Sequence, residues 1–174
     1  LTEITGFCHL FSCQLVCSIH YRFSNRFLFL YDSIVRMSKI NSPWLKENGL
    51  RIGHLNINHA KNKLTEISSI LTNSGKNFHI FGFSETRLSN VITNSDISIP
   101  SYNIVCRDPA QSRGTGILLY IHQSIRLKRI QTLEQNHVET VWIEVQIKYC
   151  KPFLLCFLYR NPAEKVDWYN RFIS

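Results

Sequence analysis

Residues 50–56, LRIGHLN, and residues 78–84, FHIFGFS, are the two stretches of this sequence that decide the fold. Each is an apolar run of the length of a buried strand, and each closes in polar side chains. Between them, apolar residues recur at spacings of three and four, at Leu64, Ile67, Ile70 and Leu71. This pattern predicts a helix over 59–73, ended by Gly75. The whole stretch therefore predicts a strand–helix–strand unit whose two strands run parallel.

The downstream sequence predicts a series of strands and a final helix. Residues 139–148 alternate between two faces, which is typical of a strand. Residues 113–116, RGTG, predict a hairpin turn, because a nucleotide-binding loop needs a longer glycine pattern. One crossover followed by antiparallel hairpins predicts an α+β fold with mixed sheets. The expected elements are strands at 103–106, 116–122, 139–148 and 152–159, an extended segment at 124–133 and a helix from Ala163.

The composition is that of a globular domain with a basic surface. The chain has 174 residues, 44% hydrophobic and 18% charged, so it can bury a core and is not a disordered tail. Its formal net charge of +8 favours a polyanionic partner such as nucleic acid. A basic surface without any nucleic-acid role is the alternative, since no long run of lysines or arginines marks a binding stripe.

The cysteines and histidines show no metal-site pattern. No two cysteines form a C-x-x-C pair, and no two histidines lie four residues apart. We therefore expect neither a zinc site nor a disulfide framework. The six cysteines are expected to be the reduced thiols of a cytosolic or nuclear protein, namely Cys8, Cys13, Cys17, Cys106, Cys150 and Cys156.

Composition changes near residue 49, which divides the chain into an unassigned segment, 1–49, and a domain, 50–174. The stretch from Ile4 to Tyr21 carries no formal charge, as a membrane span would, but histidines, a glutamine and serines interrupt it. We therefore expect no stable membrane insertion. Because the chain opens with Leu1 and has Met37 as its only methionine, we expect a fragment, or a start assigned too far upstream, and no signal peptide.

Three of the predicted strands end in side chains that suit phosphate and metal chemistry. Asn56 closes the first, Glu85 follows the second and Tyr159 closes the last. Ligands gather at the carboxyl ends of strands in open α/β sheets, and magnesium often needs only one or two carboxylates. The pattern predicts a site for a metal and a phosphate. Taken singly, a turn asparagine, a solvated glutamate and a packing tyrosine are also common at such positions.

Four further residues near these strand ends are candidate nucleic-acid contacts. Arginine side chains bind phosphate oxygens, and an asparagine amide can also donate to them. Each of the four, taken alone, is more often an ordinary surface or turn residue. The candidates are Asn58, Arg87, Arg113 and Arg160.

The ordered phrases of residues 50–174 resemble the endonuclease/exonuclease/phosphatase superfamily, and most closely the endonuclease domain of non-LTR retrotransposons. The resemblance rests on the series in order, because each phrase alone is weak. The phrases are LNIN at 55–58 with NKL at 62–64, GFSETRL at 82–88, PSY at 100–102 with RD at 107–108, RGTGI at 113–117, VETVWIE at 138–144 and YRNP at 159–162.

The resemblance implies a fold, a reaction and roles for the site residues. Family members are four-layer α/β sandwiches that cleave phosphodiesters with Mg²⁺ or Mn²⁺. By resemblance, Asn56 would orient the scissile phosphate, Glu85 would be the metal ligand, and Tyr159 would contact the phosphate near the transition state. The partner would be DNA, which retrotransposon enzymes of this kind nick so that the freed end primes reverse transcription.

Two later phrases of the family, Gly-Asp-Phe-Asn and Ser-Asp-His, do not occur in this sequence. They supply the groups that activate water, and without a general base the attack on phosphorus loses a large catalytic factor. We therefore expect an incomplete four-layer sandwich whose second half, including most of the second sheet, is missing. The chain is expected to be a fragment of a retrotransposon-type endonuclease domain, inactive as it stands.

Two other functions stay open on the sequence. A phosphatase of the same superfamily would share the phrases around Asn56 and Glu85, and phosphate release would distinguish it. A non-catalytic nucleic-acid-binding remnant would bind duplex DNA in a salt-sensitive way without needing Glu85. The inferred substrate favours a nuclear location, and the reduced cysteines fit the nucleus or the cytoplasm.

Overall fold

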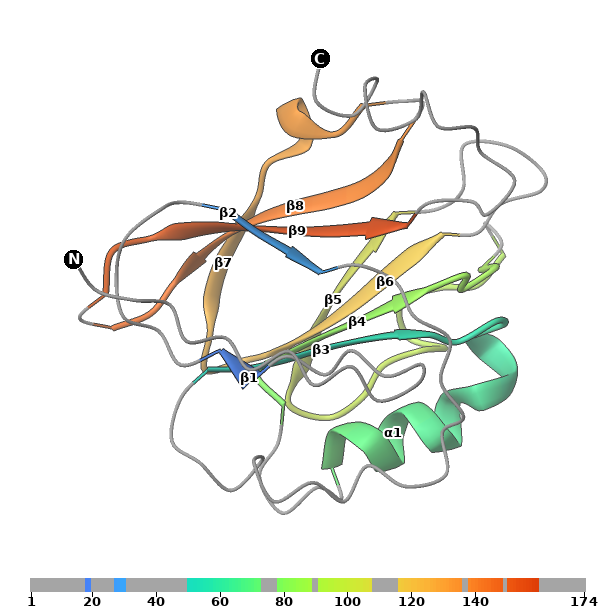
Figure 1. Ribbon diagram of the computed structural model, residues 1–174. Helices are drawn as coiled ribbons and strands as arrows, with labels where there is room; N and C mark the ends of the chain where they lie inside the picture. The colour runs from blue at the N-terminus through green and yellow to red at the C-terminus, as the bar shows by residue number, and fades with distance from the viewer. Residues whose placement is uncertain are drawn as a thin grey trace.

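The computed structural model describes residues 18–19, 27–30, 50–72, 78–88, 91–107, 116–135, 138–148 and 150–159, the first two ranges as backbone only. These residues form two β-sheets and one α-helix, which lie in the order helix, sheet, sheet (Figure 1). Both sheets are mixed, since each contains parallel and antiparallel pairs. The predicted α+β class with mixed sheets is confirmed.

The first sheet contains the predicted strand–helix–strand unit. Strands β3 and β4 pair in parallel, with Asn56 opposite Ser84, and the chain between them forms the 3-10 helix η2 and the helix α1. Strands β5 and β6 pair as an antiparallel hairpin, as expected, while its turn lies outside the described residues. The sheet order is β1-β3-β4-β6-β5, with bounds β1 Ser18–Ile19, β3 Leu50–Asn56, η2 Lys61–Lys63, α1 Leu64–Thr72, β4 Ile80–Ser84, β5 Tyr102–Arg107 and β6 Ile117–His122.

The second sheet has four strands in the order β2-β9-β8-β7. The expectation that most of it is missing is therefore wrong. The reason is that the alternating residues of β8 and β9 give this sheet an apolar inner face, which covers the first sheet. Because α1 is the only α-helix among the described residues, a fourth layer is not observed in them. The bounds are β2 Phe27–Leu30, β7 Arg126–Arg129, β8 Glu139–Gln146 and β9 Phe153–Tyr159.

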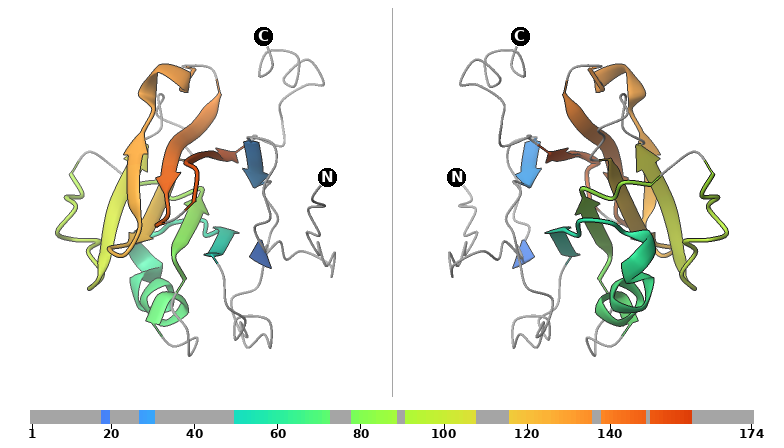
Figure 2. Two further views of the ribbon diagram at one scale, coloured as in Figure 1. Left: turned by 90° about the vertical axis from the view of Figure 1, so that its left-hand side faces the viewer. Right: turned by 90° about the vertical axis from the view of Figure 1, so that its right-hand side faces the viewer.

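The main core lies between the two sheets, which pack face to face in the side views of Figure 2. Every second residue of the central strands points into it, so the pleat of each strand decides which side chains meet. Gly82 of β4 makes room for the ring of Phe157 from β9, because a Cβ at Gly82 would overlap that ring. The members contributed by β4, β6, β8 and β9 include Ile80, Leu119, Ile121, Val141, Ile143, Val145, Leu155 and Phe157.

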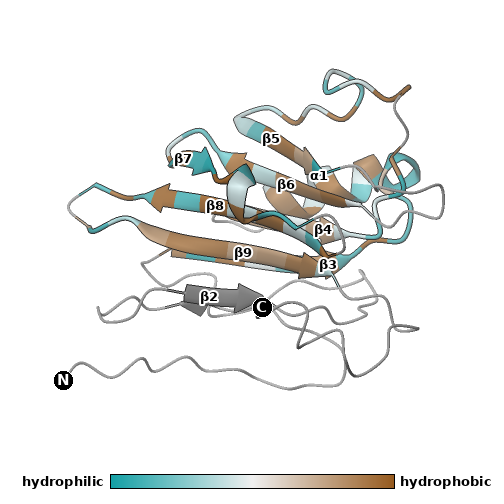
Figure 3. Ribbon diagram, turned by 90° about the horizontal axis from the view of Figure 1, so that it is seen from above, coloured by the Kyte–Doolittle hydropathy of each residue, from teal (hydrophilic) through white to brown (hydrophobic). Residues whose placement is uncertain are grey.

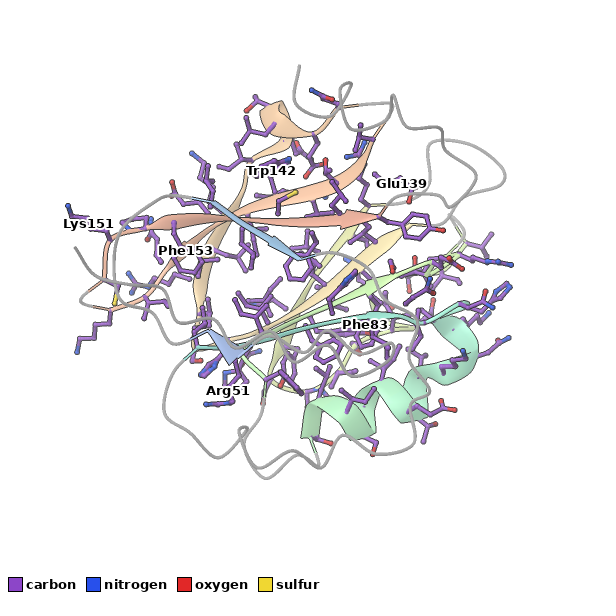
Figure 4. The ribbon with its side chains drawn as sticks, viewed as in Figure 1. Arg51, Phe83, Glu139, Trp142, Lys151 and Phe153 are labelled. Atoms are coloured by element: carbon purple, nitrogen blue, oxygen red, sulfur yellow. The ribbon has the colours of Figure 1, made fainter. Side chains whose placement is uncertain are left out.

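A second core lies between the first sheet and α1. The apolar face of α1, predicted from its spacing, contributes Ile67, Ile70 and Leu71. Phe81 and Phe83 of β4 pack against it with their rings stacked at 4.8 Å, and Figure 4 labels Phe83 above the helix. Successive residues of β4 therefore face opposite cores, odd numbers toward α1 and even numbers toward the second sheet.

The outer face of the second sheet is also packed. Trp142 is only 9% exposed, and Cys156 beside it is fully buried. Burial raises the pKa of the Cys156 thiol to about 12, in keeping with an inert reduced thiol. Residues 139–148 alternate in sequence, and Trp142, on the face opposite Val141 and Ile143, belongs to a packed cluster with Cys156 and Leu158. The edge strand β7 is largely hydrophilic in colour in Figure 3, whereas β9 is mostly hydrophobic.

A cluster of charged side chains joins the edge of the first sheet to the second. Arg107, at the end of β5, donates to the backbone carbonyls of Thr140 and Gln135. Arg129 of β7 donates to the Cys106 carbonyl at 2.8 Å and, through two N–H groups, to both oxygens of Glu134 at 2.8 Å each. The Glu134 carboxylate is 8% exposed and lies 3.8 Å from Arg107. The cluster therefore ties β5 to β7 and β8.

Some predicted bounds differ from the structure. The helix begins at Leu64 and not at residue 59, because Asn58 and His59 have positive φ and the 3-10 turn η2 follows them. The extended segment from 124 is strand only over β7 and then turns into the 3-10 helix η3, Gln131–Leu133. Within the described part of the chain, no helix has the length and apolarity needed to cross a membrane.

Candidate functional site

Three strands from both sheets end at the same edge of the molecule. β3, β4 and β9 point toward the same side in Figure 1, and β3 and β4 end together because they pair in parallel. The side chains of Asn56 and Tyr159 both lie on the faces that the two sheets turn toward each other. This edge is where the sequence predicts a site.

Asn56 and Tyr159 both donate hydrogen bonds to the same oxygen of the Glu85 carboxylate. The Asn56 amide nitrogen donates to Glu85 Oε1 at 2.8 Å, and the Tyr159 hydroxyl donates to it at 2.7 Å. The expectation that Asn56 and Glu85 lie side by side is therefore confirmed. Hydrogen bonds to a carboxylate are stronger than neutral ones. Two of them on Oε1 fix the orientation of the carboxylate and direct Oε2 away from Asn56 and Tyr159.

Glu85 reaches these partners only because the backbone turns at this residue. If β4 continued as a strand, residue 85 would point toward α1 with Phe81 and Phe83. Instead Glu85 has φ of 51°, in the left-handed region, and its side chain lies on the side of Tyr159. Such a conformation costs a non-glycine residue on the order of 1–3 kcal/mol and is found preferentially at functional sites.

Strained backbone is concentrated at this edge. Among the described residues, five non-glycine residues have positive φ, and four of them follow β3 or β4. Backbone bonds hold these two loops together, from His59 N to the Glu85 carbonyl at 3.0 Å and from Ala60 N to the Thr86 carbonyl at 2.9 Å. The parallel ladder is thus extended past the strands and offsets the strain. The four residues are Asn58, His59, Glu85 and Arg87.

The other candidate residues divide into those that the structure brings to this edge and those that it does not describe. Arg87 NH2 lies 3.9 Å from Glu85 Oε2, and its NH1 lies 3.1 Å from Nε2 of His59. Asn58 is exposed in the same loop as His59. Arg113 and Arg160 lie outside the described residues.

The sequence gives no pattern that identifies His59 or Ser84 as parts of this edge. Because an arginine can only donate, Nε2 of His59 accepts and its proton is on Nδ1. Ser84 is fully buried on the inter-sheet side, and its hydroxyl has no hydrogen-bond partner among the described residues. Only the register of β4 against β3, which the sequence does not specify, places Ser84 beside Asn56.

The donor set fits a hard cation that keeps most of its water. Glu85 is an acidic residue at this edge, its side chain is 18% exposed, and its Oε2 does not accept from Asn56 or Tyr159. Magnesium is often bound by one or two carboxylates with several waters. The described residues contain no group of three histidines, cysteines or acidic residues that could hold a metal ion, so protein ligands to a cation here would be few.

Comparison with models of known protein families and with curated proteins finds no match to this chain.

Proposed function

We propose that residues 50–174 carry the metal- and phosphate-binding part of a retrotransposon-type endonuclease domain of the endonuclease/exonuclease/phosphatase superfamily. The activity of such a domain is metal-dependent nicking of DNA, within a four-layer α/β sandwich. The observation that carries the proposal is the carboxylate of Glu85, held on one oxygen by Asn56 and Tyr159 and free of both on the other.

Each residue has a role that follows from its contacts. Glu85 would hold a magnesium or manganese ion through Oε2, and the ion would neutralise negative charge on the phosphodiester. Asn56 and Tyr159 keep the carboxylate in one orientation before any ligand arrives, which spares the site a reorganisation cost. The Tyr159 hydroxyl donates a hydrogen bond to Glu85, so it contacts the carboxylate directly.

The substrate assignment is supported by charge. The chain has a formal net charge of +8. The exposed Arg87 lies 3.9 Å from Glu85, and the exposed Lys61 begins η2, which follows the loop after β3. Duplex DNA is a polyanion whose backbone contacts come chiefly from such residues. A nucleic acid is therefore a better match to this edge than a neutral or cationic substrate.

The test is Mn²⁺ binding to the full chain. Binding is measured as the decrease of the electron paramagnetic resonance signal of free Mn²⁺. We expect one Mn²⁺ site, which Glu85→Gln weakens about tenfold or more, because the substitution removes the carboxylate charge that Asn56 and Tyr159 hold at the site. The matched control, Glu66→Gln, removes an exposed carboxylate from α1 and leaves the affinity unchanged. Absence of the Mn²⁺ site, or equal binding by Glu85→Gln and wild type, would contradict the proposal.

Activity is a separate measurement. Because the water-activating phrases of the family are absent from the sequence, we expect no magnesium-dependent nicking of supercoiled plasmid by this chain. Nicking that Glu85→Ala abolishes would show that the chain activates water by other residues. Release of inorganic phosphate from nucleotides or phospholipids would instead favour the phosphatase alternative.

A further inference from the structure

Arg87 contacts both loops of the site at once. Its NH2 lies 3.9 Å from Glu85 Oε2, and its NH1 lies within 3.1 Å of His59 Nε2. The two partners come from different loops, one after β3 and one after β4. The guanidinium therefore spans from the carboxylate to the exposed outer side of the edge, where the Arg87 side chain is 46% exposed.

The two oxygens of Glu85 face different partners. Oε1 accepts from the neutral donors Asn56 and Tyr159, whereas Oε2 faces the cation Arg87. A divalent ion on Oε2 would therefore meet a guanidinium that already lies beside the same oxygen. Two cations beside the same carboxylate oxygen repel each other, so each weakens the binding of the other.

The contact between Arg87 and Glu85 is suited to exchange. At 3.9 Å it is longer than a hydrogen bond, and an ion pair of that exposure contributes little. Asn56 and Tyr159 keep Glu85 in place whether or not Arg87 is near. The fixed left-handed backbone of Arg87 leaves the side chain as the part that can move.

We propose that Arg87 neutralises Glu85 in the metal-free protein, that a divalent cation displaces it from Oε2, and that the displaced guanidinium then contacts a DNA phosphate. The inference rests on the proposed function, since it assumes that Glu85 holds a metal ion. A guanidinium suits both positions, because its planar fork of N–H donors matches carboxylate and phosphate equally well. His59 Nε2 accepts a hydrogen bond from NH1 of Arg87, on the exposed side of the guanidinium.

Mn²⁺ affinity of the full chain tests the first half of the proposal. Arg87→Gln removes the competing cation, so it is expected to bind Mn²⁺ about two- to fivefold more tightly than wild type. Lys61→Gln is the matched control, because it removes one positive charge from the same edge but has no ion pair with Glu85. An equal shift in Lys61→Gln would overturn the exchange and leave only a general charge effect.

DNA affinity at saturating Mn²⁺ tests the second half. Fluorescence anisotropy of a labelled duplex in low salt is expected to show weaker binding by Arg87→Gln than by Lys61→Gln. Arg87→Lys, which keeps the charge but not the fork, is expected to lie between wild type and Arg87→Gln. Equal duplex affinity of Arg87→Gln and Lys61→Gln would overturn the phosphate contact.

The two proposals fail in different ways. If wild type has no Mn²⁺ site, or if Glu85→Gln binds Mn²⁺ as tightly as wild type, the proposed function fails. If that Mn²⁺ site is present and Arg87→Gln does not tighten it, only the exchange by Arg87 fails. Circular dichroism of each variant separates these results from unfolding, which is not expected for an exposed side chain.

Discussion

At the scale of single residues, Glu85 illustrates how one backbone angle creates a site. A side chain that strand pleating would send toward α1 is turned to the opposite side, where it meets two donors. Glutamate rarely adopts a left-handed φ, and residues held in such conformations cluster at functional sites.

His79 gives a prediction for pH dependence. Burial, the neighbouring Arg51 cation and the nearby His122 lower the pKa of His79 to about 4, and the Arg51 backbone N–H donates to its Nδ1 at 2.9 Å. The unfolded chain, with a pKa near 6.5, binds more protons between these values. Stability from neutral His79 is therefore present above about pH 6.5 and is lost as the pH falls toward 4.

Urea denaturation between pH 7 and pH 4.5 measures this effect. The comparison is with His79→Asn, because carboxylates also titrate toward the acid end of the range. The difference in unfolding free energy between wild type and His79→Asn should shrink as the pH falls. A constant difference over the range would show that His79 does not carry the dependence.

At the scale of elements, the close approach of β4 and β9 gives a second prediction. Gly82→Ala places a methyl group where the Phe157 ring lies, so the ring or the strand must shift. We expect a loss of about 1–3 kcal/mol in unfolding free energy, as for other overpacked cores. Urea denaturation of Gly82→Ala measures it.

Phe157→Leu serves as the partner substitution in a double-mutant cycle. The smaller side chain relieves the overlap, so the double variant should be more stable than the sum of the single changes implies. Strict additivity would mean that the methyl group is accommodated without touching Phe157.

The elements themselves were predictable where the sequence pattern was strong. The alternation of β8 predicted its two faces, and Val141, Ile143 and Val145 indeed point into the inter-sheet core. The start of α1 was not predictable from periodicity, since residues 59–63 follow left-handed backbone angles that have no hydrophobic pattern. The expectation that most of the second sheet is missing was wrong, because β8 and β9 already supply an apolar face that covers the first sheet without the later phrases of the family.

At the scale of the whole molecule, the cluster around Glu134 gives a third prediction. Glu134→Gln removes the carboxylate that accepts two hydrogen bonds from Arg129 and faces Arg107, and both arginines stay mostly buried. Removing one member of such a cluster leaves uncompensated charge, so we expect a loss of about 1–3 kcal/mol in urea denaturation.

Glu144→Gln is the control for this prediction. It removes a carboxylate from the outer side of β8. Among the described residues, Glu144 accepts one long hydrogen bond, from Gln146 Nε2 at 3.4 Å. A change within about 0.5 kcal/mol is expected there. If the two variants lose the same stability, the cluster is not what joins the sheets.

The long-range arrangement explains why some polar groups could be predicted and others could not. Asn56, Glu85 and Tyr159 each follow an apolar run, so position along a strand was enough to select them. Arg107, Arg129 and Glu134 occupy ordinary loop and edge positions, and only the packing of the two sheets brings them together. Sequence periodicity contains no information about such pairing between sheets.

The bond between Tyr159 and Glu85 joins the two sheets at their shared edge, since one partner ends β9 and the other follows β4. Occupancy of the carboxylate and cohesion between the sheets are therefore thermodynamically linked. A ligand that binds Glu85 only in the folded protein raises the melting temperature of the protein as the ligand concentration increases. Conversely, loosening the packing between the sheets at Gly82, three residues before Glu85, should weaken ligand binding without altering a group that contacts the ligand.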